Sequence, residues 1–181
     1  MKRFVVALWE VSEILIVALA SIFIIYNFIA QPFLVQGASM EPNFQSGNYL
    51  LVDELSYRFR DPIRGEVIVF INPNNESEFY IKRIIGLPTE KIDIINSQVF
   101  VDGDKIDEYY LPLGADFKGD YSFILDSDEY FVMGDNRSQS FDSRNWGPLA
   151  KDKIVGAVRL RFWPINKFQI FIDDYATQEN N

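Results

Sequence analysis

The 181-residue sequence contains no histidine and no cysteine. The absence of cysteine excludes disulfides, thiolate zinc sites and a cysteine nucleophile. The absence of histidine excludes every catalytic arrangement in which an imidazole takes the proton from a nucleophile. A serine nucleophile in this chain therefore needs another base, and the remaining candidates are lysine, aspartate and glutamate.

Basic residues are scarce relative to acidic ones, with 17 Lys and Arg against 26 Asp and Glu and a net charge of -9. Because an acidic protein repels phosphate backbones, nucleic acid is not an expected partner. The segments Asp102-Gly103-Asp104 and Asp126-Ser127-Asp128 lack the spacing and the terminal glutamate of a calcium loop, so we expect no metal and no cofactor. Hydrophobic residues make up 48% of the chain, which suits one domain with a substantial core.

Charge is also absent from a long apolar stretch near the N-terminus. Ile14 to Tyr26 carries none, Lys2 and Arg3 precede it, and the next Lys or Arg is Arg58. About 20 residues of helix span the hydrocarbon core of a bilayer. The positive-inside bias then predicts that residues 1–31 form a cytoplasmic N-terminus and a single transmembrane anchor, with the rest of the chain extracytoplasmic.

Two alternatives compete with an uncleaved anchor. Ala18-Leu19-Ala20 has the small-x-small pattern of a signal-peptide cleavage site, and the same stretch could be a buried core helix. The apolar run continues well past Ala20, which favours the anchor.

Beyond Pro32, short runs rich in β-forming residues alternate with turn signals. This pattern predicts a mostly β fold with an antiparallel domain built from hairpins over residues 32–175. Residues 103–128 are polar and irregular, which indicates an inserted hairpin or small lobe, and residues 176–181 are expected to be a flexible tail. The clearest runs are Tyr49–Val52, Glu66–Phe70, Gln98–Val101 and Tyr130–Met133.

Ser39 is a candidate nucleophile, because it lies in a tight setting with Gly37 and Ala38 before it and Met40 and Pro42 after it. Lys82 lies inside an apolar, strand-like segment and is a candidate base for this serine. Strand alternation places Tyr80, Lys82 and Ile84 on one face. A lysine that faces inward loses hydration, which lowers its pKa from about 10.4. A neutral amine near Ser39 can accept the hydroxyl proton. The alternative is that Lys82 points to water, as most strand lysines do.

A second polar cluster, Gly134 to Arg144, holds two Asp, two Arg and three Ser after a predicted strand. Taken alone, this composition is typical of a solvated loop whose side chains bond to their own backbone.

Together these features resemble the bacterial type I signal peptidases, or leader peptidases, which are membrane-bound Ser/Lys endoproteases. Four motifs of that family occur in order: Ser39–Pro42 (S-M-x-P), Arg64–Phe70, Tyr80–Pro88 and Gly134–Arg144. The resemblance covers most of the chain. It implies an antiparallel β domain of the signal-peptidase and repressor-peptidase type behind a single transmembrane helix. It also implies a location in the bacterial plasma membrane and cleavage of signal peptides from exported preproteins after a small-x-small (A-x-A) motif, without a cofactor.

The resemblance assigns roles to individual residues. It implies that Ser39 attacks the scissile carbonyl and that Lys82 is general base and then general acid. Five more residues are implied to support them: Ser140 bonded to the amine, Asp142 paired with Arg144, and Asp135 paired with Arg83.

The oxyanion and substrate sites follow from the same resemblance. The Ser39 N–H is the implied oxyanion donor, and many members place a Ser or Thr hydroxyl two residues earlier, where this chain has Gly37. A backbone group or a water is then needed as second donor. The preprotein is implied to bind as an extended strand. The residues implied to contact it are Pro32, Phe33, Leu34, Val35, Gln36, Gly37, Phe79, Tyr80 and Ile81.

Two other functions remain as alternatives. A self-cleaving Ser/Lys regulatory peptidase shares the β fold, but such proteins are soluble and carry a DNA-binding region in place of an anchor. A non-catalytic, membrane-anchored β module that binds exported chains would be expected to lose Ser39 or Lys82, and both are present.

Overall fold

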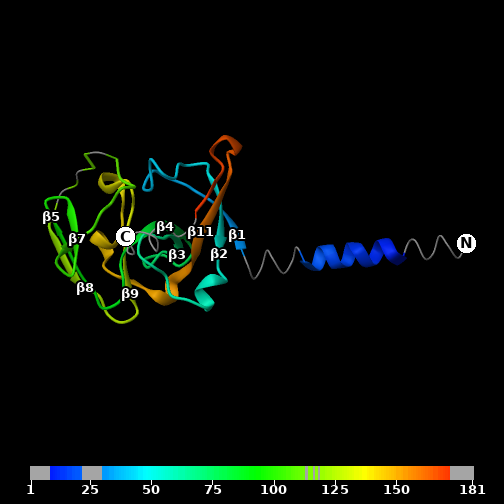
Figure 1. Cartoon of the computed structure of the whole chain (residues 1–181), viewed down its shortest axis with the longest axis horizontal. Coiled ribbons are helices and arrows are strands. Elements are labelled where there is room, and N and C mark those ends of the chain that lie inside the picture. Colours follow the sequence, from blue (N-terminus) through cyan, green and yellow to red (C-terminus); the bar gives the residue numbers. More distant parts are fainter. Residues whose placement is uncertain (1–8, 22–29, 113, 116, 118, 172–181) are drawn as a thin grey trace, which may run out of the picture.

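The computed structural model describes residues 9–21, 30–112, 114–115, 117 and 119–171. Two antiparallel sheets form the framework of the described chain (Figure 1), in agreement with the mostly β prediction. The first has the strand order β1-β2-β11-β3-β4-β9-β10, with β12 paired to β11. Its strands are β1 (Ala30–Leu34), β2 (Tyr49–Asp53), β3 (Val67–Ile71), β4 (Phe79–Gly86), β9 (Glu129–Met133), β10 (Leu149–Ala150), β11 (Ile154–Trp163) and β12 (Gln169–Ile170).

The second sheet is smaller, with the order β7-β6-β5-β8. We call residues 91–128 the inserted lobe, because the chain leaves the first sheet after β4 and returns to it at β9. The lobe therefore includes two strands ahead of the predicted segment 103–128. Nothing in an isolated strand tells which sheet it will join. Its strands are β5 (Lys91–Ile95), β6 (Gln98–Val101), β7 (Asp104–Lys105) and β8 (Tyr121–Ile124).

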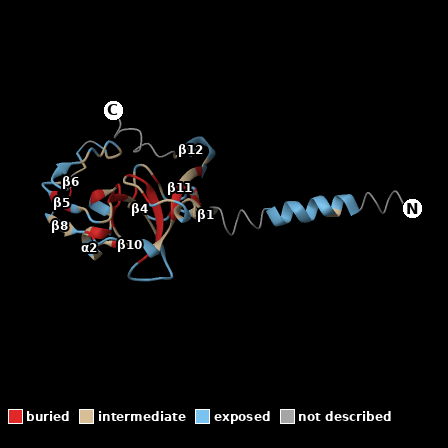
Figure 2. Cartoon of the chain, turned by 60° about the horizontal axis from the view of Figure 1, so that its bottom comes forward, coloured by how far each residue is buried: buried red, intermediate tan, exposed pale blue. Residues whose placement is uncertain are grey.

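Burial follows the position of each strand (Figure 2). In β2 the pattern alternates, with Leu50 and Val52 fully buried. In β3, which lies between β11 and β4, four successive residues are buried because both faces of the sheet are covered. Val67 and Val69 pack in one cluster and Ile68 and Phe70 in another.

Short helices occupy several of the connections. Asp142 begins the single turn α2, where its side chain accepts from the Arg144 N–H and Asn145 completes a capping box. The short helices are η1 (Ser56–Arg58), η2 (Arg137–Gln139), α2 (Ser143–Trp146), η3 (Lys151–Lys153) and η4 (Ile165–Lys167).

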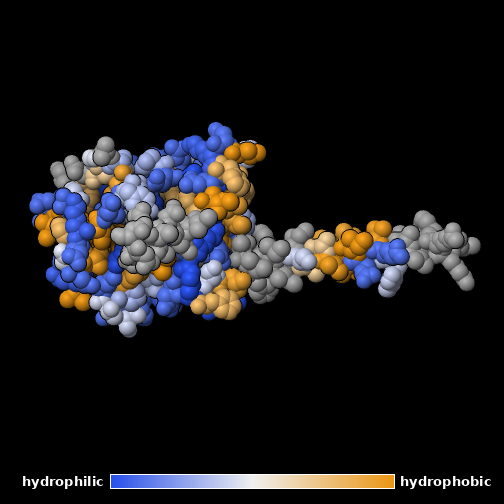
Figure 3. All heavy atoms as spheres, viewed as in Figure 1, coloured by the Kyte–Doolittle hydropathy of each residue, from blue (hydrophilic) through white to orange (hydrophobic). Residues whose placement is uncertain are grey.

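Residues 9–21 are helical, and their apolar side chains are exposed, Ile14 by 70% and Ile16 by 65% (Figure 3). Within the described residues, no helix has both the length and the apolar character needed to cross a membrane. The predicted anchor falls partly on residues 1–8 and 22–29, and the predicted tail on 176–181. Those residues lie outside the described ranges.

Candidate active site

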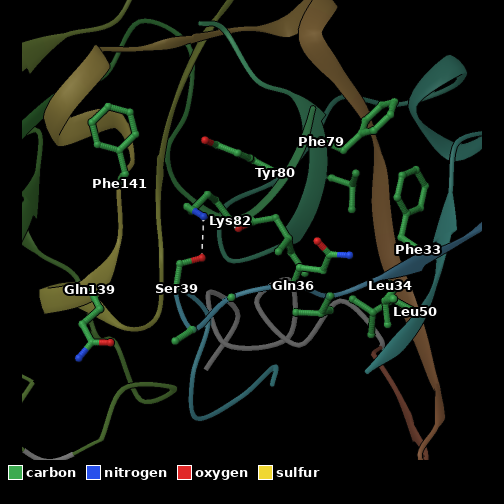
Figure 4. Close-up of a pocket in the computed structure, with 15 residues that line it drawn as sticks. Phe33, Leu34, Gln36, Ser39, Leu50, Phe79, Tyr80, Lys82, Gln139 and Phe141 are labelled. Atoms are coloured by element: carbon green, nitrogen blue, oxygen red, sulfur yellow. Dashed lines mark hydrogen bonds between the residues drawn. The ribbon is translucent and has the colours of Figure 1, made fainter. Parts of the chain in front are cut away.

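Ser39 and Lys82 meet in a pocket of the first sheet (Figure 4). Lys82 Nζ donates hydrogen bonds to Ser39 Oγ and to the Ile81 carbonyl, both at 2.8 Å. The Lys82 side chain is buried, with 4% of its surface exposed. The sequence left open whether this lysine points to water, and the structure directs it at the serine.

Local packing fixes each partner. Ser39 lies in a turn after β1, and the buried side chains of Met40 and Phe44 hold that turn to the core. The Phe44 N–H donates to the Met40 carbonyl at 2.9 Å, which closes the turn. Lys82 lies in β4 opposite Ile68 of the central strand β3. The nucleophile is therefore on a short connection and the candidate base on a rigid strand.

Burial lowers the pKa of Lys82 from 10.5 to about 8, while the carboxylates of Asp142 and Asp135 act in the opposite direction. The nitrogen also lies 5.4 Å from the centre of the Tyr80 ring. A substantial fraction of the amine is therefore neutral in mildly alkaline solution. A neutral amine 2.8 Å from a hydroxyl is placed to accept its proton.

The polar cluster after β9 lies directly behind the serine turn. The Asn136 N–H donates to the Ser39 carbonyl at 3.0 Å, and its side-chain amide donates to the Ala38 carbonyl at 3.1 Å. A Cβ added at Gly134 would collide with the Ser39 carbonyl oxygen and the Ser140 side chain. Close approach of the two segments therefore requires glycine at position 134.

Asp142 is fully buried beneath this loop and pairs with Arg144 through two contacts of 2.8 Å. The Gly134 N–H donates to the same carboxylate at 2.9 Å. Burial acts to raise the pKa of Asp142, but the Arg144 guanidinium, the Ser140 hydroxyl and the Gly134 N–H together hold that pKa below its ordinary value. Asp142 is thus a fixed negative charge that orders the loop and stabilises a cation at Lys82.

A second buried ion pair joins Asp135 to Arg83, the residue after Lys82. Its two contacts are 2.8 and 2.7 Å, and only 1% of the Asp135 side chain is exposed. The bidentate geometry fixes the relative orientation of β4 and the loop after β9.

Ser140 is placed differently from its implied role. Its Oγ is buried and meets no hydrogen-bond partner within the described part of the chain, although the hydroxyl is near enough to Asp142 to help lower the carboxyl pKa. Lys82 Nζ instead bonds to Ser39 and the Ile81 carbonyl.

A cavity of about 380 Å³ opens beside the dyad. Figure 4 shows β1 with the segment that follows it on one side and β4 on another, with Gln139 and Phe141 beyond the serine. Eight of the nine residues expected to contact substrate line it, and Pro32 does not. The lining comprises Phe33, Leu34, Val35, Gln36, Gly37, Ala38, Ser39, Leu50, Val69, Phe79, Tyr80, Ile81, Lys82, Gln139 and Phe141.

The cavity is flanked by two open strand edges. In the described chain, β1 pairs only with β2, and Phe79, Tyr80 and Ile81 of β4 pair only with β3. The two edges approach each other at the Phe33 and Phe79 rings, whose centroids are 5.4 Å apart. An extended peptide laid in the cavity can therefore bond to either edge.

Sequence reasoning missed the residues that hold the serine turn. Asn136 lies inside the Gly134–Arg144 motif, so the motif match was a usable signal. Asn43 donates to Asp135 Oδ2 at 2.8 Å and to the Tyr110 carbonyl at 2.9 Å. It has no signal beyond its position one residue after the Ser39–Pro42 motif, because its partners are distant in sequence.

Comparisons with known proteins identify the family of the chain. Residues 8–163 match the family described as signal peptidase, peptidase S26. A probable signal peptidase I-2 from Synechocystis is 34% identical over 170 residues, covering 91% of this chain and 78% of that protein. A signal peptidase IB from Staphylococcus aureus is 35% identical over 178 residues, covering 89% and 91%. A solved signal peptidase I from Enterococcus faecalis is 26% identical and gives a TM-score of 0.49, covering 54% of this chain and 97% of that one.

The family match covers most of the chain, and the two relatives exceed 30% identity over about nine-tenths of it. The chain therefore belongs to the signal peptidase family, peptidase S26, as a serine endopeptidase of the type I signal peptidase class.

Proposed function

We propose that the protein is a membrane-anchored signal peptidase that cleaves exported preproteins after a small-x-small motif, with Ser39 as nucleophile and Lys82 as general base. The observation that carries this proposal is the 2.8 Å contact between Ser39 Oγ and the buried Lys82 Nζ. The names of the relatives supply the substrate class.

The first half of the reaction forms an acyl-enzyme. Neutral Lys82 takes the Ser39 proton while Oγ bonds to the scissile carbonyl carbon, and the carbonyl oxygen becomes an oxyanion. The Ser39 N–H bonds to no group in the described chain and is available to donate to that oxygen. The Lys82 ammonium then protonates the leaving amine, the peptide bond breaks, and the mature chain departs.

The second half releases the signal peptide. Lys82 is neutral again because it has protonated the leaving amine. Water attacks the Ser39 ester and gives a proton to this neutral amine. Collapse of the second tetrahedral intermediate returns the proton to Ser39 and frees the new carboxylate. One water is consumed, and the dyad regains its initial state.

Two features support the small-x-small preference. The open edges of β1 and β4 accept an extended backbone. The cavity between them is lined by bulky apolar side chains, among them Leu34, Val35 and Ile81, which are proposed to exclude large side chains sterically. Residues Phe33–Gly37 and Phe79–Ile81 are proposed to contact the substrate, whereas Pro32, in the middle of β1, does not line the cavity.

The supporting residues have proposed roles that match their contacts. Asp142 with Arg144 and Asp135 with Arg83 hold the loop after β9 and keep the ammonium form of Lys82 accessible. The Ser140 hydroxyl is proposed to turn toward the amine during the reaction, because it is the one unpartnered buried hydroxyl in the described part of this loop. A peptide-binding module without catalysis gains nothing from a lysine in a desolvated site.

The central test uses full-length protein in detergent micelles with a preprotein that carries an A-x-A site. The wild type should cut after that site, as read by mass spectrometry, while Ser39→Ala and Lys82→Ala should not cut. Lys91→Ala is the matched control, because Lys91 is half exposed on β5 and should leave cleavage unchanged. Equal cleavage by Lys82→Ala and wild type would contradict the mechanism.

We further propose that residues 1–31 hold the N-terminus in the cytoplasm and anchor the catalytic domain outside. The uncharged run Ile14–Tyr26 and the exposed apolar side chains of helix 9–21 support this. The full chain should stay with membranes after extraction at alkaline pH, and external protease should digest the β domain but leave an N-terminal tag intact. Release of the intact chain by alkaline extraction would refute the anchor.

A further inference from the structure

The inserted lobe lies away from the chemistry but touches both segments that carry the dyad. None of its described residues lines the substrate cavity. Its core packs on Ile85 of β4 and on Phe131 and Met133 of β9. The stretch after β7, chiefly Tyr110, adds contacts with the residues beside the dyad, and an effect of the lobe on the reaction can pass through them.

Tyr110 contacts the catalytic machinery with both backbone and ring. Its carbonyl oxygen accepts the Asn43 side-chain amide at 2.9 Å. The Arg83 guanidinium lies over its ring, 4.0 Å from the ring centre, which is close for a cation–π contact. Its hydroxyl donates to Glu108 at 2.9 Å, and Glu108 forms an ion pair with the buried Arg137.

The Asn43 contact leads to the nucleophile. Asn43 lies in the serine turn, four residues after Ser39, and its amide also donates to Asp135 Oδ2 at 2.8 Å. One side chain therefore ties the serine turn to the lobe and to the loop after β9. Without it, the turn keeps the two backbone-directed bonds from Asn136 but loses its link to the lobe.

The Arg83 contact leads to the base. Arg83 follows Lys82 in β4 and is fixed by the bidentate pair with Asp135. Tyr110 covers the guanidinium and so shields that pair from water. The Asp135 carboxylate therefore accepts hydrogen bonds from Asn43 in the serine turn and from Arg83 in the lysine strand. Tyr110 contacts both of these donors.

We propose that Tyr110 is a positioning residue for the reaction, and that the inserted lobe serves to hold the Ser39 turn and the Lys82 strand in a fixed relative position. This inference rests on the proposed function, because it assigns a role in the same reaction. Tyr110 does not touch the dyad and acts through Asn43 and Arg83. Displacement of reacting groups by about 1 Å can cost on the order of 100-fold in rate, so such a role has a measurable effect.

The test compares kcat and KM of full-length variants in detergent with a quenched fluorescent peptide that contains an A-x-A site. Tyr110→Leu removes the ring contact and Asn43→Ala removes the bridging amide. Each should lower kcat by about 10- to 100-fold and leave KM within about twofold, because the cavity lining is untouched. Tyr110→Phe keeps the ring and the carbonyl and should retain kcat within about threefold.

The double variant and a lobe control separate positioning from general destabilisation. Tyr110→Leu with Asn43→Ala should lose more than either single variant, since the first removes the ring contact with Arg83 and the second removes the amide bond to the Tyr110 carbonyl. Ile124→Ser, at a site 74% exposed on β8, should match wild type in both constants. All rates are taken well below the melting temperature and per folded enzyme.

The outcomes are distinguishable. A wild type that does not cleave refutes the proposed function, whereas a cleaving wild type with unchanged kcat in Asn43→Ala and Tyr110→Leu refutes the positioning role alone. A rise in KM at constant kcat, or a loss explained entirely by the unfolded fraction, also overturns it. Should Tyr110→Leu not fold, Asn43→Ala decides the question by itself.

Discussion

The first sheet and the inserted lobe bury different kinds of side chain. In the lobe, the buried residues are apolar, as Ile92, Ile94 and Val99 illustrate. Every buried polar or charged side chain in the described chain lies outside it: Asn48, Glu66, Asn72, Lys82, Asp135, Arg137, Asp142, Ser143 and Arg161. Because buried charge is costly, its confinement to the first sheet and the connections around it indicates where the protein sacrifices stability for chemistry.

The contrast extends to what each charge does. Asp135 and Asp142 are paired with arginines, so their desolvation is offset. Lys82 has no such pair, and the result is an amine whose pKa falls to about 8. The lobe, with its apolar core, offers a stable support from which Tyr110 can reach this strained centre.

The largest expected effect is that of Lys82→Met, which turns the first sheet apolar at its centre. Loss of the base should reduce cleavage by at least about 10³-fold. Folding should instead be favoured: the shift from 10.5 to about 8 corresponds to about 3 kcal/mol. Peptide kinetics and denaturant titrations at pH 7 measure the two effects.

The pH dependence of the free energy of unfolding tests the origin of that stability gain. The unfolded chain binds a proton at Lys82 that the native state has lost between pH 8 and 10.5, so native stability rises across that window. The advantage of Lys82→Met should therefore be complete below pH 8 and absent above pH 10.5. An advantage that does not vary with pH would mean that the amine carries no desolvation cost.

A cavity in the inserted lobe should have the opposite result, a loss of stability without a loss of substrate binding. Ile94→Ala removes a fully buried side chain of the inserted lobe and should cost about 2 to 5 kcal/mol of stability. Folded enzyme should retain wild-type KM. Thermal unfolding and kinetics below the transition test this, and a variant that is as stable as wild type but inactive would break the comparison.

The next effect is the pH dependence of the wild type. Below pH 8 the neutral fraction of Lys82 falls tenfold per pH unit, and kcat/KM should fall with it. Above pH 8 the rate should level off. Measurements from pH 5 to 10 with the quenched peptide give the profile, and a flat line would exclude Lys82 as the base.

The smallest effect is expected at an exposed ion pair. Lys151 pairs with Asp61 at the surface, where both side chains are largely hydrated. Lys151→Ala should change stability by no more than about 0.5 kcal/mol. The same denaturant titration measures this change. A large loss of stability would show that exposed charges in this protein matter as much as buried ones.

Strand pairing was predictable only where local chemistry determines it. Asp-Gly is a typical pair in two-residue hairpin turns, and both Asp102 and Gly103 adopt positive φ between β6 and β7, as a tight hairpin requires. Asn96-Ser97 forms the same kind of turn between β5 and β6. It went unnoticed because serine is not a usual residue at that position.

The site was predictable where one motif contains the contact. Asp142 and Arg144 lie within a single motif, so the family resemblance was sufficient to imply their pairing. Asn43 and Tyr110 are 67 residues apart and carry no joint signal, so only folding reveals their contact. The orientation of Ser140 depends on rotamer choice, which no linear pattern encodes.

The open edges of β1 and β4 have a consequence for what the enzyme can select. Backbone amides are the same in every polypeptide, so a slot that grips them accepts many unrelated precursors provided that the stretch is uncoiled. A cleavage site held in a helix or a folded domain has its amides already engaged and cannot enter. If substrates bind at these edges as proposed, a precursor that folds early around its own junction should escape cleavage.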